Sequence, residues 1–132
     1  MIQSAEIRDG LVLRLDPDEL ESRGARCASE AVHRVMGPHF FLCVAADETA
    51  GNWVPLFPDP GPWRDVLANE HKAGPAGWRS SETYFHQQQV WQAPHVAVVE
   101  AAIVGGDLSK AGERNFVTDE GIDLVYAAVF GA

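Results

Sequence analysis

The segment from Gly37 to Phe57 constrains the fold more than any other part of the chain. It reads GPHFFLCVAADETAGNWVPLF. Phe40 to Ala45 is a short apolar run, and Gly37-Pro38 ahead of it stops a helix from entering, so we predict a buried strand. A polar stretch, residues 47–52, supplies Asn and Gly for a turn before Trp53 to Phe57 resumes as a second strand. The segment therefore predicts a β-hairpin with a long tip, central to the core.

Two residues of this hairpin have a predictable setting. Pro55 cannot donate a hydrogen bond to a neighbouring strand, so we expect it at an edge or a bulge of the sheet. Cys43 lies in the middle of the first strand and is expected to be a small buried residue. With Cys27 it gives no zinc-ligand spacing, and the chain has no nucleotide-binding or hydrolase motif. The sequence therefore predicts no metal site and no cofactor.

The length and net charge of the chain limit which classes of protein it can belong to. The chain has 132 residues and a net charge of −9. One core suffices for this length, so we predict a single domain over residues 1–132. The negative charge argues against a general nucleic-acid binder, although a local basic patch is compatible with it. Because the sequence shows no signal-peptide pattern and no bilayer-length apolar stretch, we expect a cytoplasmic protein without a membrane partner.

Strand patterns also flank the hairpin. Asp9-Gly10 predicts a tight hairpin turn, and apolar residues alternate over 11–15 before Asp16-Pro17. Later in the chain, residues 90–91 and 96–99 are strand-like, with a break at Ala93-Pro94, and the apolar run continues over 101–104. Because these strands lie close together in the sequence, a mostly antiparallel sheet is favoured.

Two helices are predicted. Pro62 is suited to the first position of a helix over 63–72, which Gly74-Pro75 ends. Thr118 is a good N-cap for an amphipathic helix over 119–130. The predicted fold is mostly β (α+β): a small antiparallel SH3-like barrel or curled sheet, with a short inserted helix and a C-terminal helix.

The Pro- and Gly-rich insertion over residues 58–80 is a candidate contact surface. Long insertions between strands often bind ligands or act as lids. Trp63 and Trp78 flank its middle part and could line a groove for a base or a peptide. The alternative is that both rings only pack the insertion onto the sheet.

Several side chains are candidates for chemistry. His39 precedes the buried strand, and histidine suits both proton abstraction and proton donation near neutral pH. Arg79 could stabilise a phosphorane-like charge, Ser81 could orient a phosphate, and His86 completes this polar group. The alternatives are a strand-end histidine bonded to backbone and a solvated loop.

A second basic group lies in segment 19–36, which is ambiguous between a loop and a short helical or extended piece. It contains Arg23, Arg26 and Arg34. Such a group could bind phosphate, and a solvated loop is the alternative. A basic groove that joins Arg34 to Arg64, Lys72 and Arg79 beside His39 would favour a nucleic-acid ligand.

Five segments in chain order carry a resemblance to a known family: GLVLRLDP (10–17), GPHFFLCV (37–44), WVPLF (53–57), QVWQAPHVAVV (89–99) and the expected helix over 118–130. Together they resemble the PemK/MazF-like toxin family. The resemblance implies an SH3-like barrel with a C-terminal helix, an endoribonuclease activity and an antitoxin partner. His39 stands about where the family usually has Arg, and Pro58-Asp59 about where it has Thr or Ser.

We therefore expect a toxin-like endoribonuclease that cleaves RNA without a metal, or an inactive relative. Its expected catalytic residues are His39, Arg79, Ser81 and His86, and its expected substrate-binding residues are Arg34, Trp63 and Trp78. The expected partners are RNA, an antitoxin-like protein and a second copy of the chain, because hairpin edges need cover. The alternative is a small non-catalytic binding or adaptor module that uses the insertion over 58–80.

Overall fold

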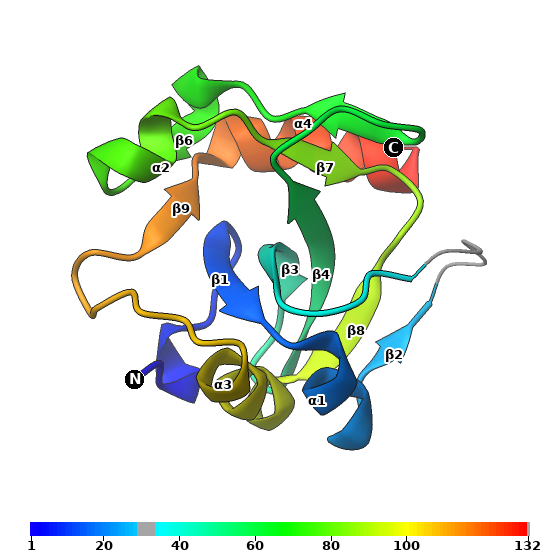
Figure 1. The fold of residues 1–132 in the computed structure, drawn as a ribbon, viewed down its shortest axis with the longest axis vertical. Coiled ribbons are helices and arrows are strands. Elements are labelled where there is room, and N and C mark those ends of the chain that lie inside the picture. The colour runs from blue at the N-terminus through cyan, green and yellow to red at the C-terminus, as the bar shows by residue number, and fades with distance from the viewer. Residues whose placement is uncertain (29–33, 132) are drawn as a thin grey trace.

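A computed structural model describes residues 1–28 and 34–131 of the chain. It is an α+β domain in which helices cover both faces of a curled antiparallel sheet (Figure 1). The described strands are β1 (Leu11–Leu15), β2 (Arg26–Cys27), β3 (His39–Ala46), β4 (Ala50–Phe57), β5 (Arg64–Val66), β6 (Lys72–Ala73), β7 (Tyr84–His86), β8 (Trp91–Pro94) and β9 (Asn115–Val117). The described helices are α1 (Pro17–Ser22), α2 (Ala76–Ser80), α3 (His95–Val104) and α4 (Asp119–Phe130), with 3₁₀ turns η1 (Ser4–Glu6) and η2 (Asn69–His71).

The predicted hairpin is confirmed as the pair β3–β4. Its register pairs Phe41 with Pro55 and Cys43 with Trp53, and one irregularity follows Cys43. The strand order is β2-β8-β4-β3-β1-β9-β6, and β7 pairs with β4 and β5. The two ends of this order, β2 and β6, do not pair with each other within the described residues, so the sheet is curled and not closed into a barrel.

Pro55 lies neither on an edge strand nor at the bulge, so that prediction was wrong. On the side of β4 away from β3, β8 pairs with β4 as far as Trp53, and β7 pairs from Leu56 onward. Pro55 lies at this change of partner. A residue that cannot donate a ladder hydrogen bond is tolerated there because neither β8 nor β7 pairs with it.

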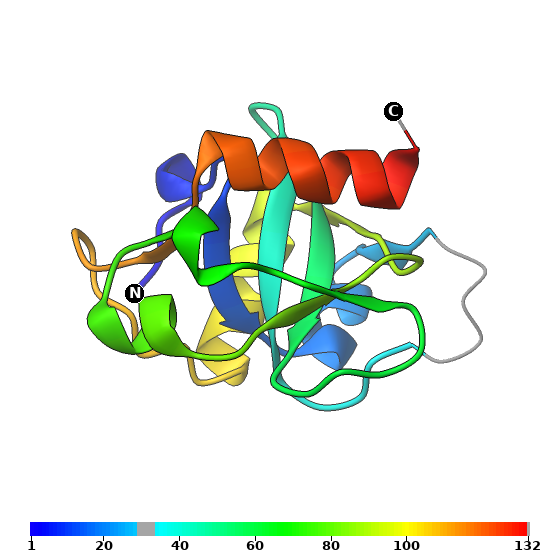
Figure 2. The same cartoon turned by 90° about the horizontal axis from the view of Figure 1, so that it is seen from above.

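The hairpin is buried on both faces, as its continuous apolar run predicts. Cys43 and Trp53 belong to a core cluster that packs against α1 and α3. Leu42 and Val54 belong to a second cluster, which α4 and the insertion cover. Figure 2 shows α4 lying across the strands on one side of the sheet. Side chains alternate between faces along a strand, so each strand serves both cores.

The C-terminal helix is confirmed. α4 spans Asp119–Phe130, and the Thr118 side chain accepts a hydrogen bond from the Gly121 N–H, which caps the helix. The strand predicted over 96–99 is wrong, because α3 occupies His95–Val104. Its buried residues Ala97, Val98, Ala101 and Ala102 recur at helical spacing, and this pattern outweighs the β-propensity of the valines.

The helix predicted over 63–72 is also wrong. Trp63 has φ 62°, a left-handed conformation that turns the chain, and β5 then pairs with β7. η2 and β6 follow, and the short inserted helix is α2. The fold therefore keeps an inserted helix, but it begins after Pro75 rather than after Pro62.

The N-terminal segment differs from the predicted hairpin. Asp9 and Gly10 form a turn, yet η1 rather than a strand precedes it, and β1 pairs with β3 and β9. In the ambiguous segment, α1 begins at Pro17 and its N-cap Asp16 accepts a hydrogen bond from the Glu19 N–H. The predicted helical or extended piece over 28–36 falls partly outside the described residues.

Candidate functional site

A cleft of about 560 Å³ opens where the start of β3 and the end of β4 meet the insertion. We call it the His39 cleft. Its apolar wall contains several rings and prolines, and its polar groups come from four different segments of the chain. The lining residues are Arg14, Pro38, His39, Phe40, Leu56, Phe57, Pro58, Gly77, Trp78, Ser81, Glu82, Thr83 and Asn115. A concave, largely apolar site with a few convergent polar groups is typical of a ligand pocket.

His39 is held in a defined orientation at the first position of β3. Its Nδ1 lies 2.9 Å from the Gly37 carbonyl oxygen, and its ring packs edge-on against Phe57 at 5.3 Å. A carbonyl oxygen only accepts hydrogen bonds, so Nδ1 carries a proton. In the neutral ring, Nε2 then has the free lone pair. Both sequence interpretations of His39 are thus compatible with the structure: it bonds to backbone, and it keeps a nitrogen that can accept a proton.

Lys72 puts a positive charge behind the wall of the cleft. Its Nζ donates to the Ser81 carbonyl and the Thr83 hydroxyl, each at 2.7 Å, and lies 4.4 Å from the centre of the Trp78 ring. The side chain is 5% exposed, and no carboxylate within the described residues pairs with it. Burial lowers the pKa of Lys72 to about 8. All three residues that Lys72 contacts, Ser81, Thr83 and Trp78, line the cleft, so the charge acts on the cleft through its wall.

Two further charges lie in the wall itself. Arg14 is half-buried on β1, and its Nε donates to the Gly105 carbonyl at 2.9 Å. Glu82 is exposed and accepts a hydrogen bond from the Tyr84 hydroxyl at 2.8 Å, which raises the pKa of Tyr84. Together with Lys72, these residues leave the cleft with one more cation than anion, in a protein whose net charge is −9.

The structure brings three of the predicted site residues together in the cleft: His39, Ser81 and Trp78. The Ser81 hydroxyl donates to the Trp78 carbonyl at 3.0 Å, which fixes its position. The Trp78 ring is mostly buried, and its Nε1 donates to the Phe116 carbonyl at 2.9 Å. Trp78 therefore both anchors the insertion to the sheet and lines the cleft.

Arg79 and His86 are not among the residues that line the cleft. Arg79 is exposed on α2, and its Nε donates to the Gly74 carbonyl at 2.8 Å. His86 is buried, and its Nδ1 accepts from the Gln88 N–H at 3.0 Å. Burial, and to a smaller extent the Arg64 charge, lower the pKa of His86, so the ring is neutral near pH 7.

Trp63 and Arg34 also lie away from the cleft lining. Trp63 is 59% exposed on the turn that precedes β5. Arg34 forms ion pairs with Asp18 and Glu21 of α1, at 2.7 and 2.5 Å. Arg23 likewise pairs with Glu19 at 3.2 Å. Two of the three arginines of the predicted phosphate patch are thus neutralised by α1, and Arg26 is the member of the patch that keeps no described partner.

The basic groove expected beside His39 is not present among the described residues. Arg34 pairs with α1, and the Arg64 guanidinium stacks 3.7 Å from the centre of the Phe57 ring. Lys72 is buried, and Arg79 faces outward from α2. The four cations come from separate elements and make separate contacts, so the groove that would favour a nucleic-acid ligand is absent from the described residues, which counts against a nuclease.

The sequence interpretation missed Arg14 and Thr83, and it considered Lys72 only as part of an open basic groove and not as a buried cation. Arg14 is the only polar residue in the run over 11–15, which marks it as facing away from the core. No comparable pattern in the sequence indicates that Lys72 is buried, because its segment was assigned to a helix. Its burial follows from the long-range pairing of β6 with β9.

Comparison of the chain with protein-family models, with curated proteins and with solved structures finds no match. Over residues 1–28 and 34–131, no group of three or more His, Cys, Asp and Glu side chains has a geometry that could hold a metal ion. In the same part of the chain, no helix has the length and apolar character needed to cross a membrane.

Proposed function

We propose that this protein is a toxin-like endoribonuclease and that the His39 cleft is its active site. One observation carries the proposal. His39 and Pro58 come from the two positions where the PemK/MazF-like pattern has its reactive residues, and both line the same cleft. Ser81 and Trp78, selected from the sequence for phosphate and base contacts, line it as well.

The proposed reaction is an attack of the RNA 2′-oxygen on the neighbouring phosphorus. His39 Nε2 accepts the 2′-hydroxyl proton while the bond from phosphorus to the 5′-oxygen breaks. Water in the open cleft supplies the proton that the leaving 5′-oxygen takes up. The products are a 2′,3′-cyclic phosphate and a 5′-hydroxyl. Arg14 and the charge of Lys72 stabilise the extra negative charge that develops on the phosphate oxygens.

The net charge of −9 limits the size of the RNA footprint. A protein that contacts many phosphates needs a broad basic surface, and Arg14 is the one arginine or lysine in the cleft lining. Aromatic rings bind single-stranded bases without a basic surface, and Phe40 and Trp78 supply such rings here. We therefore propose a short single-stranded segment as the substrate, with a shallow dependence of binding on salt.

Induced expression in a bacterial host tests this function. The wild-type protein is expected to arrest growth, and His39→Ala is expected to relieve the arrest. Arg79→Ala is the matched control, because Arg79 is exposed, close in sequence to Ser81 and outside the cleft lining. Arrest that persists in His39→Ala at equal protein level would contradict the proposed active site, and normal growth with the wild type would contradict the toxin assignment.

A second candidate function is a small non-catalytic binding module. It is favoured by the contribution of the insertion to the cleft, since Pro58, Gly77 and Trp78 all line it. An RNA-cleavage assay with the purified protein distinguishes the binding module from the nuclease. A binding module leaves RNA intact, whereas the nuclease cleaves it and loses this activity in His39→Ala.

The proposal extends to the cellular setting: a cytoplasmic enzyme, held inactive by an antitoxin-like protein, acting as a homodimer. The edges of the sheet do not by themselves require a second copy. β2 and β6 are two residues long, and very short edge strands resist pairing with other chains. Size-exclusion chromatography with light scattering measures the oligomeric state directly.

A further inference from the structure

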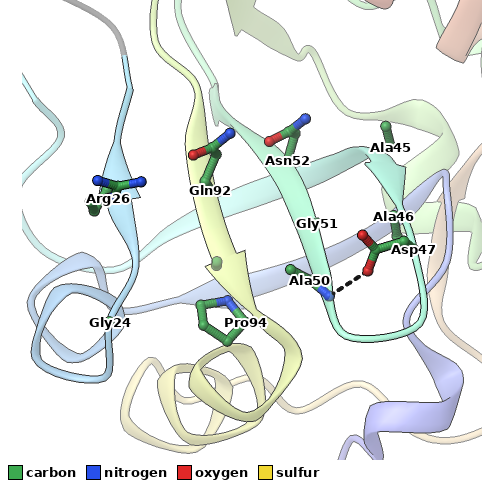
Figure 3. A pocket seen from close by; sticks show the side chains of 11 residues that line it. Gly24, Arg26, Ala45, Ala46, Asp47, Ala50, Gly51, Asn52, Gln92 and Pro94 are labelled. Carbon is green, nitrogen blue, oxygen red and sulfur yellow. Dashed lines mark hydrogen bonds between the residues drawn. The ribbon is translucent and has the colours of Figure 1, made fainter.

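A second groove lies at the opposite end of the β3–β4 hairpin, over the face of the sheet formed by β2, β8 and β4. Its volume is about 550 Å³. Arg26, Gln92 and Asn52 line it, and they are register partners on three neighbouring strands. Figure 3 shows their side chains projecting from the sheet in the same direction. We call these three residues the polar row.

Within the described residues, the hydrogen-bonding groups of the polar row have no protein partner. Arg26 and Gln92 are exposed, Asn52 is half-buried, and none of the three side chains forms a hydrogen bond or ion pair within the described residues. The neighbouring arginines behave differently, since Arg23 and Arg34 both pair with carboxylates of α1. The row thus presents one guanidinium and two carboxamides to solvent.

The floor around the row is made of small residues. Ala45, Ala50, Gly51 and Pro94 line the same groove, so an incoming main chain can approach the sheet closely.

The groove ends in a carboxylate. Asp47 lines it on the side opposite Arg26 and accepts a hydrogen bond from the Ala50 N–H at 2.9 Å (Figure 3). It also accepts one from the Thr49 N–H at 2.8 Å. These bonds lower the pKa of Asp47, which keeps it ionised near pH 7. Along the groove the order is therefore cation, carboxamide, carboxamide, anion.

We propose that the polar row binds an extended peptide segment with a carboxylate at the Arg26 end and a cationic group at the Asp47 end. A carboxamide offers one acceptor and a donor group, as a peptide unit does, and a guanidinium matches a carboxylate. Neighbouring strands lie about 4.8 Å apart, so the row from Arg26 to Asn52 spans roughly 10 Å, or about three residues of extended chain. Small floor residues leave room for that chain.

The charges favour peptide over RNA at this groove. A nucleic acid would meet a single arginine at one end and the Asp47 carboxylate at the other, and the second contact repels phosphate. A dipolar peptide is complementary to both ends. The inference does not rest on the nuclease proposal, because the two sites share no lining residue.

Two blocked peptides of identical composition test the inference: acetyl-Lys-Ala-Ala-Glu-amide, whose charges lie at opposite ends, and acetyl-Ala-Lys-Glu-Ala-amide, whose charges are adjacent. Titrations followed by NMR chemical shifts at millimolar peptide are expected to perturb Arg26, Gln92 and Asn52, with tighter binding of the peptide whose charges lie at opposite ends. Arg26→Gln is expected to weaken that peptide by about fivefold and to remove the preference between the two. Arg23→Gln is the matched control, since Arg23 is already paired with Glu19.

The Arg26 side chain makes no described hydrogen bond or ion pair, so its replacement is expected to leave the fold intact. Equal binding of both peptides by the wild type, or no shift at the row with either, would overturn the proposal. A short oligouridine that perturbs the row while both peptides leave it unchanged would assign the groove to RNA instead.

Discussion

The two ends of the β3–β4 hairpin offer opposite kinds of surface. At the His39 end, the insertion folds over the strands, and Lys72 and Ser81 are held by hydrogen bonds within the wall. At the other end, the polar row stands on an uncovered sheet face without described partners. Fixed groups in a walled cleft suit chemistry that depends on position, whereas free polar groups on an open floor suit recognition of a chain.

The difference arises from the partner change on β4. β8 runs beside β4 only as far as Trp53, and it carries Gln92 next to Asn52. From Leu56 onward β7 takes its place and brings the segment around Ser81 and Thr83 toward the hairpin end. A single strand therefore contributes to both sites, and Pro55 separates the two regions.

The largest expected effect of a point change concerns the His39 end alone. His39→Gln keeps a polar side chain of similar length but removes the proton acceptor, so RNA cleavage is expected to fall by about 10²–10⁴-fold. Single-turnover rates on a fluorescent oligonucleotide measure it. Asn52→Ala, at the other end of the hairpin, is expected to leave the rate unchanged. Equal loss in both variants would mean that the two ends are not separate sites.

A second prediction concerns Lys72, the buried cation behind the His39 cleft, and the dependence of stability on pH. The pKa of Lys72 is about 8 in the fold, against an ordinary value of 10.5. Between these pH values the unfolded chain holds the proton and the folded chain has lost it, so Lys72 makes the free energy of unfolding rise with pH across this window. Below pH 8 its destabilising effect is fully present.

Lys72→Met is expected to remove this rise, as measured by urea unfolding at several pH values from 7 to above 10. Lys110→Met is the matched control, because Lys110 is exposed and the chain has no other lysine. A wild-type stability curve that does not steepen relative to Lys72→Met across the window would show that Lys72 is not desolvated.

The smallest expected effect is that of Arg79→Ala. Arg79 is exposed on α2, and within the described residues its side chain donates one hydrogen bond, to the Gly74 carbonyl. Its removal is therefore expected to change the cleavage rate by less than about twofold, within the range of ordinary surface substitutions. The same oligonucleotide assay measures it. A loss of cleavage rate comparable to that of His39→Gln would show that the active site extends onto the exposed side of α2. The chemistry would then not be confined to the His39 cleft.

Sequence reasoning succeeded where short-range pattern decides structure. The β3–β4 hairpin and α4 follow from an apolar run, a polar tip and an N-cap within single segments. It failed at α3, where valine-rich composition favoured a strand although buried alanines recur at helical spacing. It also failed at residues 63–72, where pairing with β7 decides the structure.

The candidate site was predictable only in part, because its residues come together through strand pairing between segments that are distant in the sequence. His39 could be selected because it precedes a recognisable strand. Ser81 and Arg79 are neighbours in the sequence, yet only Ser81 lines the cleft, since α2 ends between them. Arg14 and Lys72 reach the site through β1 and β6, whose partners are distant in the sequence.

The most direct test of the nuclease proposal is the chemistry of the RNA ends. Purified wild-type protein is incubated with a defined single-stranded RNA, and the fragments are analysed by mass spectrometry. The proposed mechanism predicts fragments ending in a 2′,3′-cyclic phosphate, each followed by a fragment with a 5′-hydroxyl, and none of them with His39→Gln. Intact RNA with the folded wild type, or the same fragments with His39→Gln, would contradict it.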